Sequence, residues 1–137
     1  MKVVERVDLV KRYETSPFWN LIGLKVDSIT EDGATIKMEV TPALLNGNKM
    51  MHGGVFSTLL DAAMGINLKL AVGDVKYVTI SLLTHYLKAV RSGETVYATA
   101  KIIQTGRSIG TVEASIFNDK DELVSCGSAT FKFRRPE

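Results

Sequence analysis

The residues best suited to chemistry lie in the segment from Asn46 to Asp61. His52-Gly53-Gly54 stands where a polar loop meets the start of a long apolar run. If that run is a helix, the backbone N–H groups of its first turn have no internal partner and carry the positive end of the helix dipole. Glycine allows a ligand to approach such a backbone closely. The arrangement could hold a carbonyl oxygen while it becomes an oxyanion, as acyl transfer requires.

Asp61 is the second candidate, because it is a carboxylate among predicted apolar neighbours. At about 100° per residue it lies about 150° from the main apolar stripe of the predicted helix, beside Met64 and Leu68. A carboxylate among apolar neighbours is costly to bury, tends towards a raised pKa and is a candidate for function. The alternative is that this face is exposed and Asp61 is simply solvated. The sequence leaves both interpretations open.

The spacing between these two features limits how they can work together. His52 and Asp61 are nine residues apart, about 13 Å along a helix, so both cannot reach one carbon atom within a single chain. If Gly53 and Asp61 share a site, Asp61 must come from a second subunit. A two-fold dimer would then build two such sites.

The segment from Gly53 to Val72 is the one long helical candidate, and Gly73-Asp74 closes it. Its apolar residues form a main stripe and an opposite side, which predicts burial all round. The main stripe comprises Val55, Leu59, Ala62, Ala63, Ile66 and Leu70, and the opposite side carries Leu60, Met64 and Leu68. A small sheet cannot enclose the whole helix, so the leftover apolar side predicts a partner subunit.

The other predicted elements are mostly strands. A hairpin is expected around Asp32-Gly33, and a loop from Thr41 to Met51. Four strands follow the helix with short turns between them, at Lys76 to Lys88, Thr95 to Gln104, Ser108 to Asn118 and Glu122 to Phe133. Short turns imply antiparallel neighbours. The order therefore predicts an α+β fold in which an antiparallel sheet wraps around one helix.

The N-terminal segment is predicted to cover this core. A short helix is expected from Val7 to Thr15, ended by Ser16-Pro17 because proline disfavours helix in the residue before it. An apolar patch then caps the core, formed by Phe18, Trp19, Leu21 and Ile22. Trp19 is expected to pack there, and it could also line a binding site.

Composition excludes several classes of protein. The chain has 137 residues, which predicts a single domain spanning 1–137. Its net charge is +2 with no clustered basic face, so no nucleic-acid partner is expected. Cys126 is the only cysteine, and no set of side chains has metal-ligand spacing. With no signal-peptide pattern and no uninterrupted apolar stretch of roughly 18 to 20 residues, a cytoplasmic protein without membrane contact is expected.

The Asn46…His52-Gly53-Gly54…Asp61 pattern resembles the hotdog-fold acyl-CoA thioesterases of the phenylacetate-degradation type, over about 21–133. The resemblance implies five to six antiparallel strands around a central helix, in a dimer or a dimer of dimers. It also implies that the Gly53 N–H and Asn46 polarise the thioester carbonyl. Asp61 of the partner subunit would activate water or act as nucleophile, and His52 would brace the loop.

The resemblance also assigns contacts to the carboxylate and to CoA. A hydroxyl on the strand after the helix usually lies near the carboxylate, and Thr79 is the matching residue. Gly54, Arg107 and Ser108 are the expected contacts to CoA, which is part of the substrate, so no separate cofactor is implied. Arg107 could meet a CoA phosphate. An ordinary solvated charge in a turn is the competing interpretation.

Two other functions fit the same scaffold. A hydratase or dehydratase would need a histidine and a carboxylate as acid and base, and His52 and Asp61 could pair across a dimer. A non-catalytic acyl-CoA-binding module is the other alternative, which an appended DNA-binding segment would favour. Structural roles are predicted for His85 and for Cys126, which has no His or Asp close in sequence to activate it.

Overall fold

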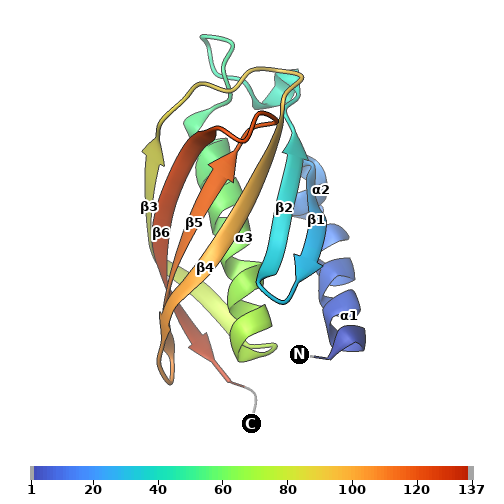
Figure 1. The fold of residues 1–137 in the computed structure, drawn as a ribbon, viewed down its shortest axis with the longest axis vertical. Coiled ribbons are helices and arrows are strands. Elements are labelled where there is room, and N and C mark those ends of the chain that lie inside the picture. The colour runs from blue at the N-terminus through green and yellow to red at the C-terminus, as the bar shows by residue number, and fades with distance from the viewer. Residues whose placement is uncertain (1, 136–137) are drawn as a thin grey trace.

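A computed structural model describes residues 2–135 as one antiparallel sheet around a central helix (Figure 1). The six strands are β1 (Leu24–Thr30), β2 (Gly33–Glu39), β3 (Lys76–Tyr86), β4 (Thr95–Thr105), β5 (Ile109–Phe117) and β6 (Leu123–Arg134). Their order in the sheet is β1-β2-β4-β5-β6-β3. Helix α3 (Gly53–Val72) packs on the sheet, with the 3-10 turn η1 (Pro42–Leu44) before it. This is the predicted α+β hotdog arrangement.

Helix α3 begins and ends where the sequence indicated. His52 is its N-cap, and Gly73 ends it with φ of +102°, a backbone conformation that favours glycine. Leu60, Met64 and Leu68 are each 0% exposed, as are Leu59 and Ile66 on the main stripe. Burial of both sides is therefore confirmed.

The prediction that the second apolar side of α3 is left over for a partner subunit is wrong. The chain's own sheet contacts α3 through β2, β3, β4, β5 and β6 and covers that side completely. The large apolar surface that does remain exposed lies on β3. This strand forms one edge of the sheet, and five of its apolar side chains are at least one-third exposed: Val78, Ile80, Leu82, Leu83 and Tyr86.

Strand β3 contains an irregularity that determines which residues face the helix. Its pairing with β6 shifts between Thr79 and Ser81, so Ile80 is an extra residue. Tyr77 and Thr79 contact α3 before this point, while Thr84 and Tyr86 contact it afterwards. A regular strand alternates strictly between faces, so the bulge is what brings odd and even positions onto the same helix.

The N-terminal helices cover the other side of the molecule, beside β1 (Figure 1). Helix α1 (Val3–Glu14) starts earlier than predicted, and α2 (Pro17–Ile22) follows the break at Ser16. The predicted apolar patch is only partly buried: Trp19 is 5% exposed, whereas Phe18 is 52% and Leu21 is 77% exposed. A helix this short turns only one face inward, and Trp19 and Ile22 occupy that face.

A buried amide joins α3 to the hairpin of β1 and β2. Strand β2 pairs with β4 only from Ile36 to Glu39, and Ala34 lies beyond this pairing. Asn67 replaces the missing neighbour, because its Oδ1 accepts from the Ala34 N–H at 2.9 Å and its Nδ2 donates to the Ala34 carbonyl at 3.0 Å. The side chain thus reproduces the hydrogen bonds of a strand.

Candidate active site

The start of α3 is organised by His52. Its Nδ1 accepts a hydrogen bond from the Gly54 N–H at 2.9 Å, and its carbonyl accepts from the Val55 N–H at 2.9 Å. The Gly54 N–H is therefore occupied, which leaves Gly53 as the first-turn donor for a ligand. A Cβ on Gly53 would lie 3.2 Å from Cε1 of Tyr86, so the glycine also makes room for that ring.

Asn46 shapes the loop that leads to this helix start. Its Oδ1 accepts from the N–H of Asn48 at 2.9 Å and from that of Met50 at 3.1 Å. The chain then returns to the core, where the His52 N–H donates to the Leu44 carbonyl at 2.8 Å. Because the carboxamide oxygen is committed to the loop, Nδ2 is the group of Asn46 that can donate to a substrate.

Asp61 lies two turns further along α3 and is half-buried. The Thr79 hydroxyl donates to its Oδ1 at 2.8 Å, so the structure brings these two predicted residues together. Burial raises the pKa of Asp61, while the hydrogen bond from Thr79 lowers it by less. The structure lies between the two interpretations from sequence, because the carboxylate is neither freely solvated nor fully buried.

The small and polar residues on either side of Asp61 form a stripe that the sequence reasoning missed. Ser57, Asp61, Gly65 and Lys69 recur at intervals of four and share one face of α3. This face runs along β3: the Ser57 hydroxyl lies 2.9 Å from that of Thr84, Asp61 meets Thr79, and Gly65 lies under Tyr77. The repeat of small or polar residues in an otherwise apolar helix is the signal that could have revealed it.

The remaining predicted site residues lie apart from Asp61 within one chain. Gly53 is eight residues away, about 12 Å along the helix. Arg107 and Ser108 are exposed in the β4–β5 turn, at the opposite end of the sheet from the start of α3 (Figure 1). The Ser108 carbonyl accepts from the Phe133 N–H at 2.8 Å, which fixes this turn against β6.

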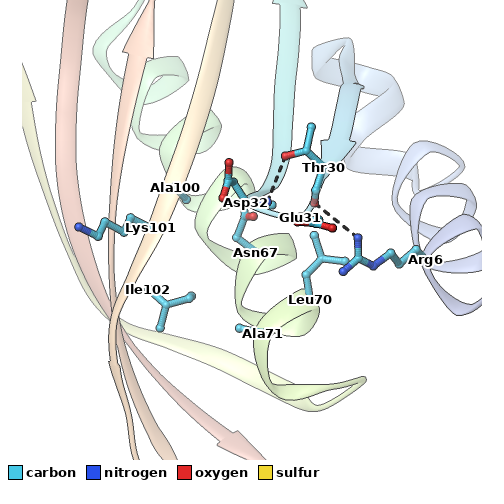
Figure 2. Close-up of a pocket in the computed structure, with 11 residues that line it drawn as sticks. Arg6, Thr30, Glu31, Asp32, Asn67, Leu70, Ala71, Ala100, Lys101 and Ile102 are labelled. Carbon is cyan, nitrogen blue, oxygen red and sulfur yellow. Dashed lines mark hydrogen bonds between the residues drawn. The ribbon is translucent and has the colours of Figure 1, made fainter. Parts of the chain in front are cut away.

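A separate cavity of about 510 Å³ lies between α1, α3, the β1–β2 hairpin and β4 (Figure 2). Asn67, Leu70 and Ala71 form its helical wall. Figure 2 shows Arg6 reaching it from α1, where its guanidinium donates to the Thr30 carbonyl at 3.4 Å. The cavity therefore uses a different face of α3 from the one that carries Asp61, and belongs to another part of the molecule.

Helix α3 is the one helix of the described residues that is long and apolar enough to cross a membrane. It is the central helix of the fold, and half of its most apolar window is buried inside the molecule. Core helices of soluble proteins share these properties, so the hydropathy of α3 is explained by its place against the sheet.

Comparison with known families agrees with this geometry. Residues 48–125, more than half of the chain, match the family model described as "Thioesterase superfamily". The chain belongs to this superfamily. The matched segment includes the start of α3, Asp61 and Thr79, and the predicted enzyme class, thioester hydrolase, is confirmed.

Individual relatives point the same way. The chain is 26% identical over 113 residues to the acyl-coenzyme A thioesterase PaaI of Escherichia coli, covering 82% of this chain and 79% of that protein. A solved structure of a conserved protein from Pseudomonas aeruginosa is 29% identical with a TM-score of 0.82, covering 90% and 98% of the two chains. The phenylacetic acid degradation protein PaaI from Thermus thermophilus, in a mutant structure, is 25% identical with a TM-score of 0.78, covering 88% and 100%.

Proposed function

We propose that this protein hydrolyses acyl-CoA thioesters to the free acid and CoA in a site shared by two subunits. The observation that carries the proposal is the half-buried Asp61 carboxylate, held by Thr79 two helical turns from the N–H groups that would polarise a carbonyl. The E. coli relative is named as an acyl-CoA thioesterase, which supports this class of substrate.

The exposed edge of β3 supports the pairing of subunits. An edge strand with unpaired backbone groups and apolar side chains is a template for pairing with another strand. Consider two β3 strands that pair antiparallel with Leu82 or Leu83 at the centre. The residue opposite Thr79 on the partner strand is then a direct neighbour of the partner's Tyr86. Thr79 contacts Asp61, and Tyr86 covers Gly53. This register therefore carries Asp61 of one chain to the partner's Gly53.

The chemistry follows from these positions. Asp61 accepts a proton from water as the water oxygen attacks the thioester carbon. The partner's Gly53 N–H and Asn46 Nδ2 donate to the carbonyl oxygen, which becomes an oxyanion. When the tetrahedral intermediate collapses, the carbon–sulfur bond breaks and Asp61 returns the proton to the CoA sulfur. A carboxylate with a raised pKa is suited to both proton transfers.

The hydratase alternative is disfavoured by the hydrogen bonding of His52. A general base would need a free imidazole lone pair, and a neutral ring that accepts at Nδ1 carries its proton on Nε2 and has no lone pair left. The Nδ1 of His52 is bonded to the Gly54 N–H, and the residue serves as the N-cap of α3. Its contacts suit the bracing role implied by the resemblance.

The surface of the protein also offers a basic region for the phosphates of CoA. Arg107 is exposed in the β4–β5 turn, and β6 adds the exposed Lys132 and Arg134 at the same end of the sheet. Guanidinium groups bind phosphate oxygens well. We assign the phosphates of CoA to this end of the subunit that supplies Gly53, with Arg107 of that subunit foremost.

The proposal is tested by Asp61→Asn, which keeps the shape of the side chain and removes the base. Thiol release from a panel of acyl-CoAs should fall roughly 100-fold or more. Glu113→Gln, an exposed carboxylate change on β5, is the matched control and should keep wild-type rates. Full activity of Asp61→Asn would remove Asp61 from the mechanism, and a wild-type protein inactive on the whole panel would refute the function.

A further inference from the structure

Tyr77 occupies the space next to Asp61 on the side away from the helix start. A Cβ on Gly65 would lie 2.1 Å from the Tyr77 hydroxyl, so the phenol rests directly on the helix backbone at this point. Gly65 is one turn beyond Asp61, about 5 to 6 Å along α3. The glycine is therefore what admits the Tyr77 side chain between β3 and α3.

Tyr77 is held in this place from several sides. Its hydroxyl lies 2.9 Å from that of Tyr13 on α1, and its ring packs edge-on against Phe131 with centroids 5.4 Å apart. The Lys69 ammonium lies over both tyrosine rings, 5.6 Å from the centroid of Tyr77 and 5.8 Å from that of Tyr13. Trp19 packs on Tyr13 with centroids 5.0 Å apart.

A cavity of about 570 Å³ lies on the far side of this tyrosine pair. Tyr13 and Tyr77 form part of its wall, and its other lining residues are Leu9, Arg12, Ser16, Trp19, Lys69 and Lys76. The Tyr77 side chain thus separates Asp61 from a space large enough for a substantial part of a small ligand.

The two hydroxyls are unsuited to proton transfer at neutral pH. Burial raises the pKa of Tyr77, and it also raises the pKa of Tyr13. Both phenols therefore stay neutral and satisfy each other by a hydrogen bond. Their position and rigidity, rather than acid–base chemistry, are what they can contribute.

We infer that Tyr77, positioned by Tyr13, closes the acyl end of the site and restricts the substrate to short acyl groups or a single ring. This inference rests on the proposed function. The CoA part of a substrate is large and charged and must extend to solvent, while the acyl part needs an apolar enclosure. From Asp61 the direction along α3 leads to Gly65 and Tyr77, and the Tyr77 side chain stands between Asp61 and the groove behind it.

The test compares kcat/KM for a series of saturated acyl-CoAs, from acetyl to palmitoyl, in the wild type and in Tyr77→Leu. Leucine keeps an apolar contact with Phe131 but does not reach Tyr13. The wild type should prefer the short members. In Tyr77→Leu the ratio of long-chain to short-chain kcat/KM should rise about 10-fold or more, since each fitted methylene contributes to discrimination.

Tyr13→Phe removes the hydrogen bond that positions Tyr77 and should shift the ratio in the same direction by less. Tyr97→Leu is the matched control, because Tyr97 lies on β4 between two buried residues and so points away from α3. Its ratio should stay at the wild-type value. Thermal melting and light scattering establish that each variant is folded and assembled.

An unchanged ratio in folded Tyr77→Leu, or a wild type that already prefers long chains, overturns the inference and leaves the proposed function intact. If Tyr77→Leu does not fold, Tyr13→Phe and Tyr77→Phe replace it, and an unchanged ratio in both overturns the inference. A wild type that hydrolyses none of the series overturns the proposed function and this inference together.

Discussion

The proposed site shared by two subunits makes a prediction about mixed dimers. Asp61→Asn removes the base, and Gly53→Val blocks the start of α3. A Cβ at Gly53 would lie 3.2 Å from Cε1 of Tyr86, a residue that is 57% exposed and can move outward, so Gly53→Val should fold. Each homodimer then has two damaged sites. A heterodimer of the two single variants has one intact site and one site with both changes, if the residues meet across the interface.

The expected rates follow from this geometry. Heterodimers isolated with two different affinity tags should show about half of the wild-type kcat per dimer, because one of the two sites is intact. The mirror experiment pairs wild-type chains with chains that carry both substitutions. Each site of that heterodimer contains one damaged residue, so it should be nearly inactive. The measurement is thiol release at saturating acyl-CoA for both heterodimers.

The two heterodimers separate the competing geometries. If Gly53 and Asp61 of the same chain formed the site, the single-variant heterodimer would be inactive and the mirror heterodimer would keep about half of the activity. That reversed pattern would refute the argument that Gly53 and Asp61 lie too far apart along α3 to share a site within one chain. Activity in both heterodimers would show that at least one of the two residues is dispensable.

Three further predictions follow from the contacts of the site. Thr79→Val removes the hydrogen bond that lowers the pKa of Asp61, so this pKa should rise further. The acidic limb of the kcat–pH profile should then move to higher pH. A limb that does not move would mean that Asp61 is not the titrating base. Asn46→Asp keeps the acceptor that holds the loop but loses the donor, so kcat should fall about 10- to 1,000-fold, and a change in KM alone would contradict the oxyanion role. Leu83→Lys on the exposed edge of β3 should give inactive monomers by light scattering, whereas the control Ile103→Lys on β4 should remain assembled and active.

The fold could be predicted from sequence because its signals are local. The limits of α3 follow from His52, Gly53 and Gly73, and strands β3 to β6 begin and end within two residues of the predicted positions. Turn and cap residues act through their own backbone, so they need no knowledge of the rest of the chain. The pattern Asn46…His52-Gly53-Gly54…Asp61 likewise identified the superfamily, since it lies almost wholly inside the matched segment.

The surroundings of the site could not be predicted in the same way. Helical arithmetic gives the order of the residues around α3, but which face of α3 meets which strand depends on how far the sheet curls. The sheet covers Leu60, Met64 and Leu68 completely, so the open face is the one with Ser57 and Asp61. Tyr13 and Tyr77 are 64 residues apart and meet only because α1 folds over the end of β3.

Strand β3 links the parts of the proposed site. One of its faces supplies Thr79 to Asp61, Tyr77 to Gly65 and Tyr86 to Gly53, while its free edge is the exposed apolar surface. A second β3 strand on that edge would therefore fix the position of the partner's helix start relative to Asp61. It would also cover the exposed apolar side chains of β3. The bulge at Ile80 matters for this reason: without it, Thr84 and Tyr86 would turn away from α3, and the strand could not contact both Asp61 and Gly53. In the proposed dimer, the assembly of subunits and the geometry of catalysis would both depend on β3.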